Sequence, residues 1–316
     1  MNERRRRFEI PASLAGERLD RALSLLTGRS RSETAKMVAD GCVLIDGEVS
    51  PVGSRRLAPN EVVEVLPEQA PDAVIEREPE IVPFDVLYAD ADVVVVNKPS
   101  GVVTHPGSGH SHGTLADALV TRFPDMAEVG QPDRPGIVHR LDRGTSGALV
   151  CARSPLAYEG LIEQISRREV RRIYAALARG HPPSPRGTID ARIGRDPHNR
   201  TLMAVMATGR EARTHYSTVE LFTYPVEASL LRCQLSTGRT HQIRVHLASI
   251  GLPLLGDLAY GVPDPFGISR PLLHASQLTF QHPASGAEMS VAAPMPADFV
   301  EALREFGSDP SAFSMN

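Results

Sequence analysis

One aspartate stands between two arginines in a short polar segment, and this segment holds the residues best suited to chemistry. It runs His139-Arg-Leu-Asp-Arg-Gly-Thr-Ser-Gly147, and its carboxylate belongs to Asp142. The guanidinium groups of Arg140 and Arg143 favour the charged form of a nearby carboxylate, so we expect Asp142 to be an ionised nucleophile. The glycines and the hydroxyl of Thr145 favour a tight loop that exposes a catalytic side chain. A structural ion pair in a turn is the alternative, and the charge pattern alone favours it.

Arginines are concentrated in the middle of the chain, although the formal net charge is −4. Residues 134–213 contain fifteen arginines and seven acidic residues, whereas residues 68–97 contain eight acidic residues and one arginine. Phosphate binding needs a positive face rather than a positive total, and the planar guanidinium suits phosphate oxygens and base edges. The charge distribution therefore permits RNA as a partner, although a codon bias would produce the same excess of arginine over the two lysines, Lys36 and Lys98.

The composition indicates a cytoplasmic protein of two domains. With 316 residues, of which 41% are hydrophobic, the chain can bury a sizeable core. Its three cysteines lie far apart in apolar surroundings, which excludes a disulfide framework and a cysteine-based zinc site. No apolar run approaches the ~20 residues that a membrane-spanning helix needs. The arginines near the N-terminus are not followed by the apolar segment of a secretory signal.

The first part of the chain is expected to form a small α/β domain with flexible segments on either side. Residues 1–16 begin with an arginine run and predict a mobile arm. Within residues 17–66, apolar residues at helical spacing predict two helices, and the Asp46-Gly47 pair predicts a β-hairpin after them. Residues 67–80 carry proline and charge with little to bury, so we interpret them as a linker.

Residues 81–306 are expected to form a second domain, with a flexible tail at 307–316. Thr114 and Ser154 are suitable N-cap residues for two of its helices. Strands and helices do not alternate as βαβ units, so the pattern predicts an α+β fold with a mainly antiparallel mixed sheet. The expected elements are strands at 86–88, 93–96, 171–177 and 230–235, and helices at 114–123, 155–165, 240–250 and 297–306.

Three long blocks occur in a characteristic order along the chain. They are VVNKPSGVVTHPG at residues 95–107, HRLDRGTSG at 139–147 and GRTHQIRVHLASIGLPLLGDLAYG at 238–261. In sequence and order, these blocks resemble the RluA/RluD-type pseudouridine synthases, over about residues 81–300. RLDRALSLL and SRSETAKMVADGCVLIDGEV, within 17–66, resemble the S-four RNA-binding module that often precedes this enzyme. The resemblance implies a pseudouridine synthase catalytic domain that isomerises uridine within RNA to pseudouridine, with no cofactor and no metal.

The resemblance also implies roles for individual residues. Asp142 matches the catalytic aspartate, which would attack either the six-position carbon of the uracil or the anomeric carbon of the ribose. Arg244 matches the arginine that pairs with this aspartate, where the ordinary alternative is a solvated helix arginine. Tyr174 matches the tyrosine that packs on the target base, although a strand tyrosine is more often part of a core. Arg140 matches the arginine that enters the RNA stack when the target nucleotide flips out, or else it is a second partner for Asp142.

A wider set of residues is expected to contact the substrate. Lys98 follows a buried strand and is expected at the pocket wall or on a phosphate, while Arg143 and Thr145 are expected beside the target nucleotide. His139 is interpreted as a structural hydrogen-bonding residue. The residues expected on the RNA backbone are Arg29, Arg31, Lys36, Arg167, Arg168, Arg171 and Arg172.

The RNA substrate expected from the resemblance is large-subunit ribosomal RNA, with transfer RNA left open. We expect a monomer without membrane or metal partners. A competing hypothesis is a non-catalytic RNA-binding factor for ribosome assembly, which the separate N-terminal module and the arginine-rich stretch also support. A hydrolase built on His139 and Asp142 fits poorly, because no nucleophile or metal set accompanies the pair.

Overall fold

The computed structural model divides into two compact units, Met1–Pro79 and Glu80–Asn316. It describes residues 6–30, 33–34, 37–38, 41–49, 53–66, 82–107, 112–199, 201–261 and 267–313. The division falls at the end of the segment expected as a linker, residues 67–80, which lies outside the described ranges. Among the described residues, no helix combines the length and the apolar character needed to cross a membrane.

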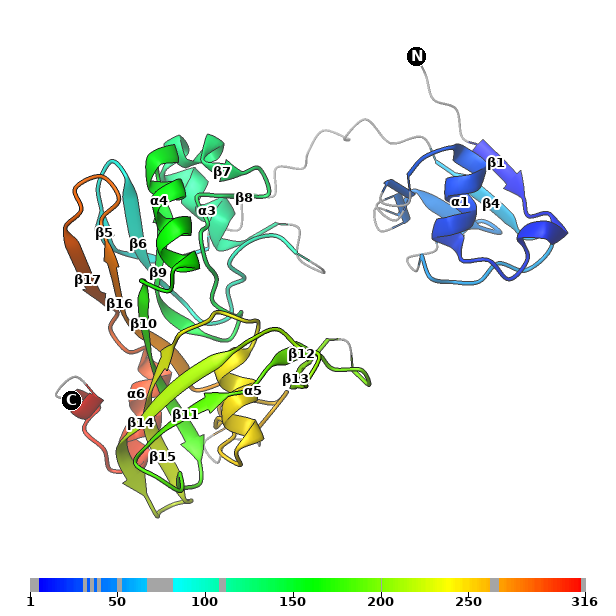
Figure 1. Cartoon of the computed structure of the whole chain (residues 1–316). Helices are drawn as coiled ribbons and strands as arrows, with labels where there is room; N and C mark the ends of the chain where they lie inside the picture. The colour runs from blue at the N-terminus through cyan, green and yellow to red at the C-terminus, as the bar shows by residue number, and fades with distance from the viewer. Residues whose placement is uncertain are drawn as a thin grey trace. The chain divides into compact units, whose positions relative to one another are not determined.

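The N-terminal unit contains a four-stranded antiparallel sheet and a helix that share one core (Figure 1). The elements are β1 (Arg6–Glu9), η1 (Ala12–Leu14), α1 (Leu19–Thr27), β2 (Val43–Ile45), β3 (Glu48–Val49) and β4 (Val62–Val65), with strand order β1-β4-β2-β3. Asp46 and Gly47 form the predicted hairpin turn with φ angles of 51° and 89°. The second predicted helix is seen at residues 33–34 and 37–38, and its other residues are not among those described.

The prediction of a mobile arm at residues 1–16 is wrong for residues 6–16. Strand β1 pairs antiparallel with β4, and Ile10 is completely buried in the core of the unit. The backbone N–H of Ile10 also donates a hydrogen bond to the carbonyl oxygen of Glu61 at 2.9 Å. The sequence did not predict this edge strand. The arginine run suggested a solvated arm, and the strand that pairs with it lies more than fifty residues later in the chain.

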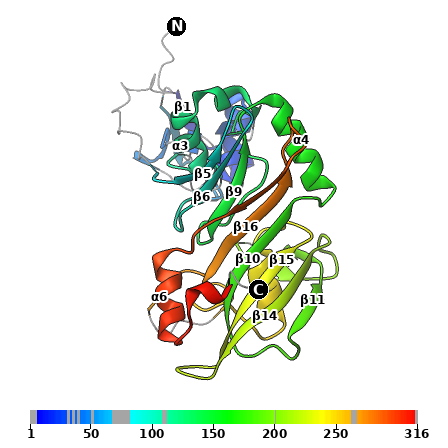
Figure 2. The same ribbon diagram turned by 90° about the vertical axis from the view of Figure 1, so that its left-hand side faces the viewer.

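The second unit has nine strands in one sheet among its described residues, in the order β11-β14-β15-β10-β16-β9-β6-β5 with β17 paired to β16 (Figure 2). Their bounds are β5 (Asp85–Ala89), β6 (Val93–Lys98), β9 (Ser146–Ala152), β10 (Arg171–Arg179), β11 (Arg186–Asp190), β14 (Arg213–Phe222), β15 (Ala228–Leu235), β16 (Leu273–Gln281) and β17 (Glu288–Ala292). Among these strands, β9 and β16 form the one parallel pair. Two small hairpins accompany the sheet: β7 (Gly130–Gln131) with β8 (Arg134–Pro135), and β12 (Ile193–Arg195) with β13 (Met203–Val205). The predicted α+β fold with a mainly antiparallel mixed sheet is confirmed.

Helices cover both faces of this sheet. They are α3 (Leu115–Arg122), η2 (Pro124–Glu128), α4 (Pro155–Ser166), α5 (Gln242–Ser249), α6 (Ala297–Glu305) and η3 (Pro310–Phe313). Helices α3 and α5 share a core with Tyr174 and Ala176 of β10, whereas α6 packs with Ala175 and Leu177. This division follows from the alternation of side chains along a strand. The predicted N-caps are present, since Thr114 forms a capping box with Asp117 and Ser154 accepts a hydrogen bond from the N–H of Ala157.

The tail predicted at 307–316 is packed rather than flexible as far as Phe313. The Phe313 side chain is buried in the core beneath α6. Its carbonyl oxygen accepts a hydrogen bond from Nη2 of Arg232 at 2.6 Å, and the guanidinium of Arg232 lies 4.6 Å from the centre of its ring. The tail was predicted to be flexible because of its polar composition, and the contribution of Phe313 to the core was missed.

Replacing Gly147 with alanine is expected to lower the free energy of unfolding by about 3 kcal/mol. Gly147 has a φ of 118° and faces Ala275 across the parallel β9–β16 pair, where an added Cβ would overlap the carbonyl oxygen of Ala275. The control Gly286→Ala has a φ of 71° but open space around the new Cβ, so strain alone should cost about 1 kcal/mol. Urea denaturation followed by circular dichroism measures both, and equal losses would contradict the crowding at Gly147.

Candidate active site

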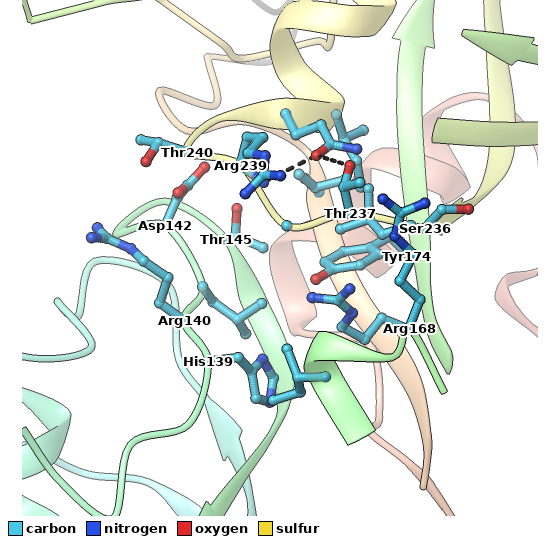
Figure 3. Close-up of a pocket in the computed structure, with 18 of the residues that line it drawn as sticks. His139, Arg140, Asp142, Thr145, Arg168, Tyr174, Ser236, Thr237, Arg239 and Thr240 are labelled. Carbon is cyan, nitrogen blue, oxygen red and sulfur yellow. Dashed lines mark hydrogen bonds between the residues drawn. The ribbon is translucent and has the colours of Figure 1, made fainter. Parts of the chain in front are cut away.

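A cavity of about 440 Å³ opens beside the loop that precedes β9 (Figure 3). Its walls come from residues 138–145, from the end of α4 and the turn after it, from β10, and from residues 235–243 at the start of α5. These segments are distant in the chain and meet at the middle of the sheet. The lining includes His139, Arg140, Asp142, Thr145, Arg172 and Tyr174.

Asp142 lies at the wall of this cavity, in a turn closed by a hydrogen bond from the N–H of Thr145 to its carbonyl oxygen at 3.0 Å. The turn leads directly into β9, in which every residue is buried. The side chain of Asp142 is 15% exposed, and its Oδ2 lies 3.8 Å from Nη1 of Arg244. This distance forms an ion pair but exceeds the length of a hydrogen bond, so the carboxylate oxygens keep their lone pairs available toward the cavity.

Arg244 is anchored on its other side by Asp257. The Nε and Nη2 atoms of Arg244 donate to the two oxygens of Asp257 at 2.7 and 2.8 Å. The guanidinium also lies 4.9 Å from the centre of the Tyr260 ring. Burial works against the charge, but the hydrogen bonds and charge of Asp257, with the charge of Asp142, raise the pKa of Arg244 above its ordinary value. Arg244 is therefore a permanently charged group held in a fixed orientation.

The supports of Arg244 were missed from the sequence, because the pattern offered only Asp142 as its partner. The carboxylate of Asp257 also accepts the N–H groups of Ala259 and Tyr260, at 3.0 and 3.3 Å, which shapes the turn that these residues form. The hydroxyl of Tyr260 accepts the N–H of Met203 at 2.8 Å and lies 2.7 Å from Nδ1 of His241. The signal in the sequence is an acidic residue followed by a tyrosine in the third of the three blocks, GDLAY.

Gln242 orders the segment that enters α5 and was also missed. Its Oε1 accepts from the hydroxyl of Thr237 at 2.7 Å and from the N–H of Arg239 at 3.0 Å (Figure 3). Its Nε2 donates to the carbonyl oxygen of Arg213 at 3.0 Å. Six consecutive residues of α5, from Gln242 to Leu247, are buried, so the helix is enclosed nearly all round.

Tyr174 forms the part of the cavity wall contributed by β10. The residue is buried between β15 and β16, and its ring faces the cavity. Burial raises the pKa of Tyr174 to about 12, with opposing effects from the charges of Arg172 and Asp142. The structure therefore brings together the three residues predicted as catalytic, since Asp142 pairs with Arg244 and shares a cavity with Tyr174.

The two arginines that flank Asp142 do not pair with it. Among the described residues, the ion pair of Asp142 is with Arg244. Arg140 is exposed at the cavity rim, and its side chain extends away from Tyr174 in Figure 3. Arg143 is also exposed and donates from Nε to the carbonyl oxygen of Gly101 at 3.0 Å. Adjacent residues in a turn point in different directions, which is why the predicted flanking pairs are absent.

Lys98 does not lie where a phosphate contact was expected. It is completely buried, and its Nζ donates to the carbonyl oxygens of Pro99 and Val102 at 2.8 Å each and of Arg143 at 3.5 Å. Burial lowers the pKa of Lys98 to about 7, while the charge of Asp142 opposes this shift. Lys98 therefore joins the loop at residues 99–102 to the loop that contains Arg143, and it is not among the residues that line the cavity.

The predicted RNA-backbone residues fall into three groups. Arg168 and Arg172 line the cavity, and Arg172, expected on the RNA backbone, is buried. Arg167 and Arg171 are exposed outside the cavity lining, and Arg167 pairs with Glu163 at 2.7 Å. Arg29 contacts Sδ of Met37 at 3.3 Å in the N-terminal unit, and the positions of Arg31 and Lys36 lie outside the described residues.

The chain is similar to known proteins over most of its length. A family model described as RNA pseudouridylate synthase matches residues 92–249. An uncharacterized RNA pseudouridine synthase of Chloroflexus aurantiacus is 46% identical over 299 residues, which cover 94% of this chain and 92% of the relative. A ribosomal large subunit pseudouridine synthase D of Escherichia coli is 41% identical over 311 residues, covering 93% and 92%. The solved structure of human RNA pseudouridylate synthase domain containing 1 superposes with a TM-score of 0.54 at 28% identity, covering 71% of this chain and 96% of that one.

Replacing Asp257 with asparagine is expected to cost about 3 kcal/mol of stability, because the buried guanidinium of Arg244 then loses the carboxylate that neutralises it. The control Asp190→Asn removes a carboxylate from an exposed pair, in which Nη2 of Arg213 lies 2.6 Å from Oδ2 of Asp190. That change should cost less than about 1 kcal/mol. Urea denaturation of the three proteins gives both differences, and two equally small losses would contradict the anchoring role of Asp257.

Proposed function

Because the chain belongs to the RNA pseudouridylate synthase family, we propose that it isomerises specific uridines of large-subunit ribosomal RNA to pseudouridine by covalent catalysis through Asp142. The observation that carries this proposal is the pairing of Asp142 with an anchored arginine at the wall of a cavity that also holds the Tyr174 ring. Relatives named ribosomal large subunit pseudouridine synthase D support the choice of RNA.

Asp142 is suited to act as a nucleophile because its ion-pair partner, Arg244, lies too far away to form a hydrogen bond with it. A guanidinium donating short hydrogen bonds would hold the carboxylate lone pairs and weaken attack. Here Nη1 of Arg244 stays 3.8 Å away, because Asp257 binds the other nitrogens of the same guanidinium. The positive charge of Arg244 thus lies near Asp142 without occupying its oxygens.

The reaction requires the bond between N1 of the base and C1′ of the ribose to break. On one route an oxygen of Asp142 bonds to C1′ as the base leaves, and on the other it bonds to C6 of the uracil before the glycosidic bond breaks. The base then rotates, C5 bonds to C1′, and the bond to Asp142 is released. The proton lost from C5 equals the one gained by N1, so the reaction is an isomerisation that needs no co-reactant.

Tyr174 and Arg140 position the target nucleotide before the glycosidic bond breaks. A uridine within a stacked RNA must leave the stack to reach Asp142, at a cost of a few kcal/mol. The ring of Tyr174 offers a stacking surface inside the cavity, and burial raises the pKa of its phenol to about 12, further above neutral pH. The exposed guanidinium of Arg140 at the rim replaces the flipped base in the RNA stack.

The N-terminal unit adds affinity for RNA as an S-four-like module. Its expected phosphate contacts are Arg29, Arg31 and Lys36. It also presents the exposed side chains of Arg18, Arg21 and Arg56, of which Arg18 pairs with Asp20 and Arg21 with Glu17. Such cations bind phosphates without reading sequence, and they make binding dependent on salt.

Replacing Asp142 with asparagine is expected to reduce uridine conversion by at least about 10³-fold, because the amide cannot form the covalent bond. RNA affinity should remain within about twofold, since the shape of the cavity is kept. Single-turnover conversion, read by carbodiimide mapping of pseudouridine, and filter binding measure the two quantities. Asp133→Asn, on an exposed turn, is the matched control and should convert uridine like the unaltered protein. Full conversion by Asp142→Asn would remove Asp142 from the chemistry, and a purely RNA-binding function predicts no conversion by any of the three proteins.

Deleting residues 1–66 is expected to weaken RNA binding and to flatten its dependence on salt. For single-stranded RNA, the slope of log K against log salt should become shallower by about 0.7 for every phosphate that the deleted unit neutralised. The second unit has its own core, so circular dichroism should report a folded truncated protein. An unchanged slope from filter binding at several salt concentrations would exclude the N-terminal unit from phosphate binding.

A further inference from the structure

Arg172 is a buried guanidinium that no other described residue neutralises. It is 7% exposed, forms no hydrogen bond or ion pair with a described residue, and its Nε is completely shielded without a partner. Its side chain lines the same cavity as Asp142 and Tyr174. Burial of a charge without a partner is strongly unfavourable, so the missing partner is expected to be an electron-rich group that enters the cavity.

His139 adds a second unsatisfied donor beside Arg172. The N–H of Val150 donates to Nε2 of His139 at 3.2 Å, so Nε2 is the acceptor of the ring. Burial and the charge of Arg172 lower the pKa of His139 to about 3, so the ring is neutral and carries its proton on Nδ1. This Nδ1 is buried without a partner among the described residues, as is the hydroxyl of Thr145. All three residues line the cavity.

These donors lie on the side of Tyr174 that faces the base. Arg172 and Tyr174 are two positions apart on β10, so their side chains project from the same face of the strand. The charges of Arg172 and Asp142 both act on the hydroxyl of Tyr174, and all three side chains line the same cavity. A uracil stacked on Tyr174 in this cavity therefore lies near both Asp142 and Arg172.

We propose that Arg172, with the Nδ1–H of His139 and the hydroxyl of Thr145, receives the carbonyl oxygens of the target uracil and stabilises the detached base as an anion. This inference rests on the proposed function. When the C1′–N1 bond breaks, its electron pair stays on the base and spreads over N1, O2 and O4. The charge on the base disappears when C5 bonds to C1′, and the proton then lost from C5 is matched by the proton gained at N1. The guanidinium thus pairs with a charge that exists only during the reaction, which is the kind of interaction that raises rate rather than affinity.

Arg172→Met tests the proposal against a structural role, because methionine keeps the buried stem and removes the charge. The single-turnover rate at saturating RNA should fall by about 10²–10³-fold, as for loss of one transition-state donor. RNA affinity should change less than about twofold, and the melting temperature should stay the same or rise, since an unpaired buried charge is removed. Arg172→Lys should recover part of the rate, because it restores the charge without the planar fork.

Two further variants complete the test: one displaces the guanidinium of Arg172, and the other is a control that removes an exposed arginine. A Cβ at Gly238 would lie 2.8 Å from Nη1 of Arg172, so Gly238→Ala displaces the guanidinium while leaving its charge. The single-turnover rate of Gly238→Ala should fall by about tenfold at an unchanged melting temperature. Arg179→Met removes an exposed arginine from the other end of β10 and should match the unaltered protein in rate and affinity.

The outcomes separate the alternatives. An unchanged rate for Arg172→Met overturns the proposal. Weaker RNA binding with a flatter salt dependence and an unchanged rate also overturns it, because Arg172 then contacts a phosphate. A fall of several degrees in melting temperature, with a rate loss that follows the unfolded fraction, assigns a structural role instead. If the unaltered protein and Arg179→Met form no pseudouridine, the proposed function fails, whereas loss in Arg172→Met alone supports the anion-binding role.

Discussion

The geometry of the site depends on how one guanidinium is shared between two carboxylates. Arg244 gives two short hydrogen bonds to Asp257, at 2.7 and 2.8 Å, and approaches Asp142 only to 3.8 Å. A guanidinium without the first partner would close on the second, since bidentate contact with a carboxylate is strongly favoured. Asp257 therefore keeps the oxygens of Asp142 uncovered, and the turn that Asp257 shapes through the N–H groups of Ala259 and Tyr260 belongs to the same arrangement.

The sheet makes this arrangement rigid. Asp142 precedes a fully buried strand, β9, whose parallel pairing with β16 joins the two antiparallel parts of the sheet. Arg244 stands on α5, which packs in the same core as Tyr174 and is held at its start by Gln242. Elements with buried faces hold side chains in place to within about half an ångström better than free loops do.

Local signals in the sequence predicted local structure well. The N-caps at Thr114 and Ser154 and the turn at Asp46-Gly47 depend on neighbouring residues alone, and each was found where expected. The edge strand at Arg6–Glu9 was missed because its partner lies far along the chain. The resemblance named Asp142, Tyr174 and Arg244 and predicted that Arg244 pairs with Asp142, whereas the charge pattern of the loop indicated Arg140 and Arg143. Sequence adjacency does not fix side-chain direction in a turn, so the partner is a residue about a hundred positions later.

Lys98 and Arg172 are two buried cationic side chains of one domain that differ in their hydrogen-bond partners. Lys98 was expected at the pocket wall or on a phosphate and Arg172 on the RNA backbone, and both are buried close to Asp142 or Tyr174. The ammonium of Lys98 is saturated by three carbonyl oxygens of its own chain, so its hydrogen bonds hold the loops together. The guanidinium of Arg172 has no such acceptor among the described residues and faces a cavity instead. Since the fold tolerates the second charge without neutralising it, the compensation has to come from the molecule that fills the cavity. Burial and charge are common to both residues. What separates them is whether their N–H groups have acceptors in the protein: those of Lys98 do and stabilise the loops, whereas Arg172 has none among the described residues and serves the reaction.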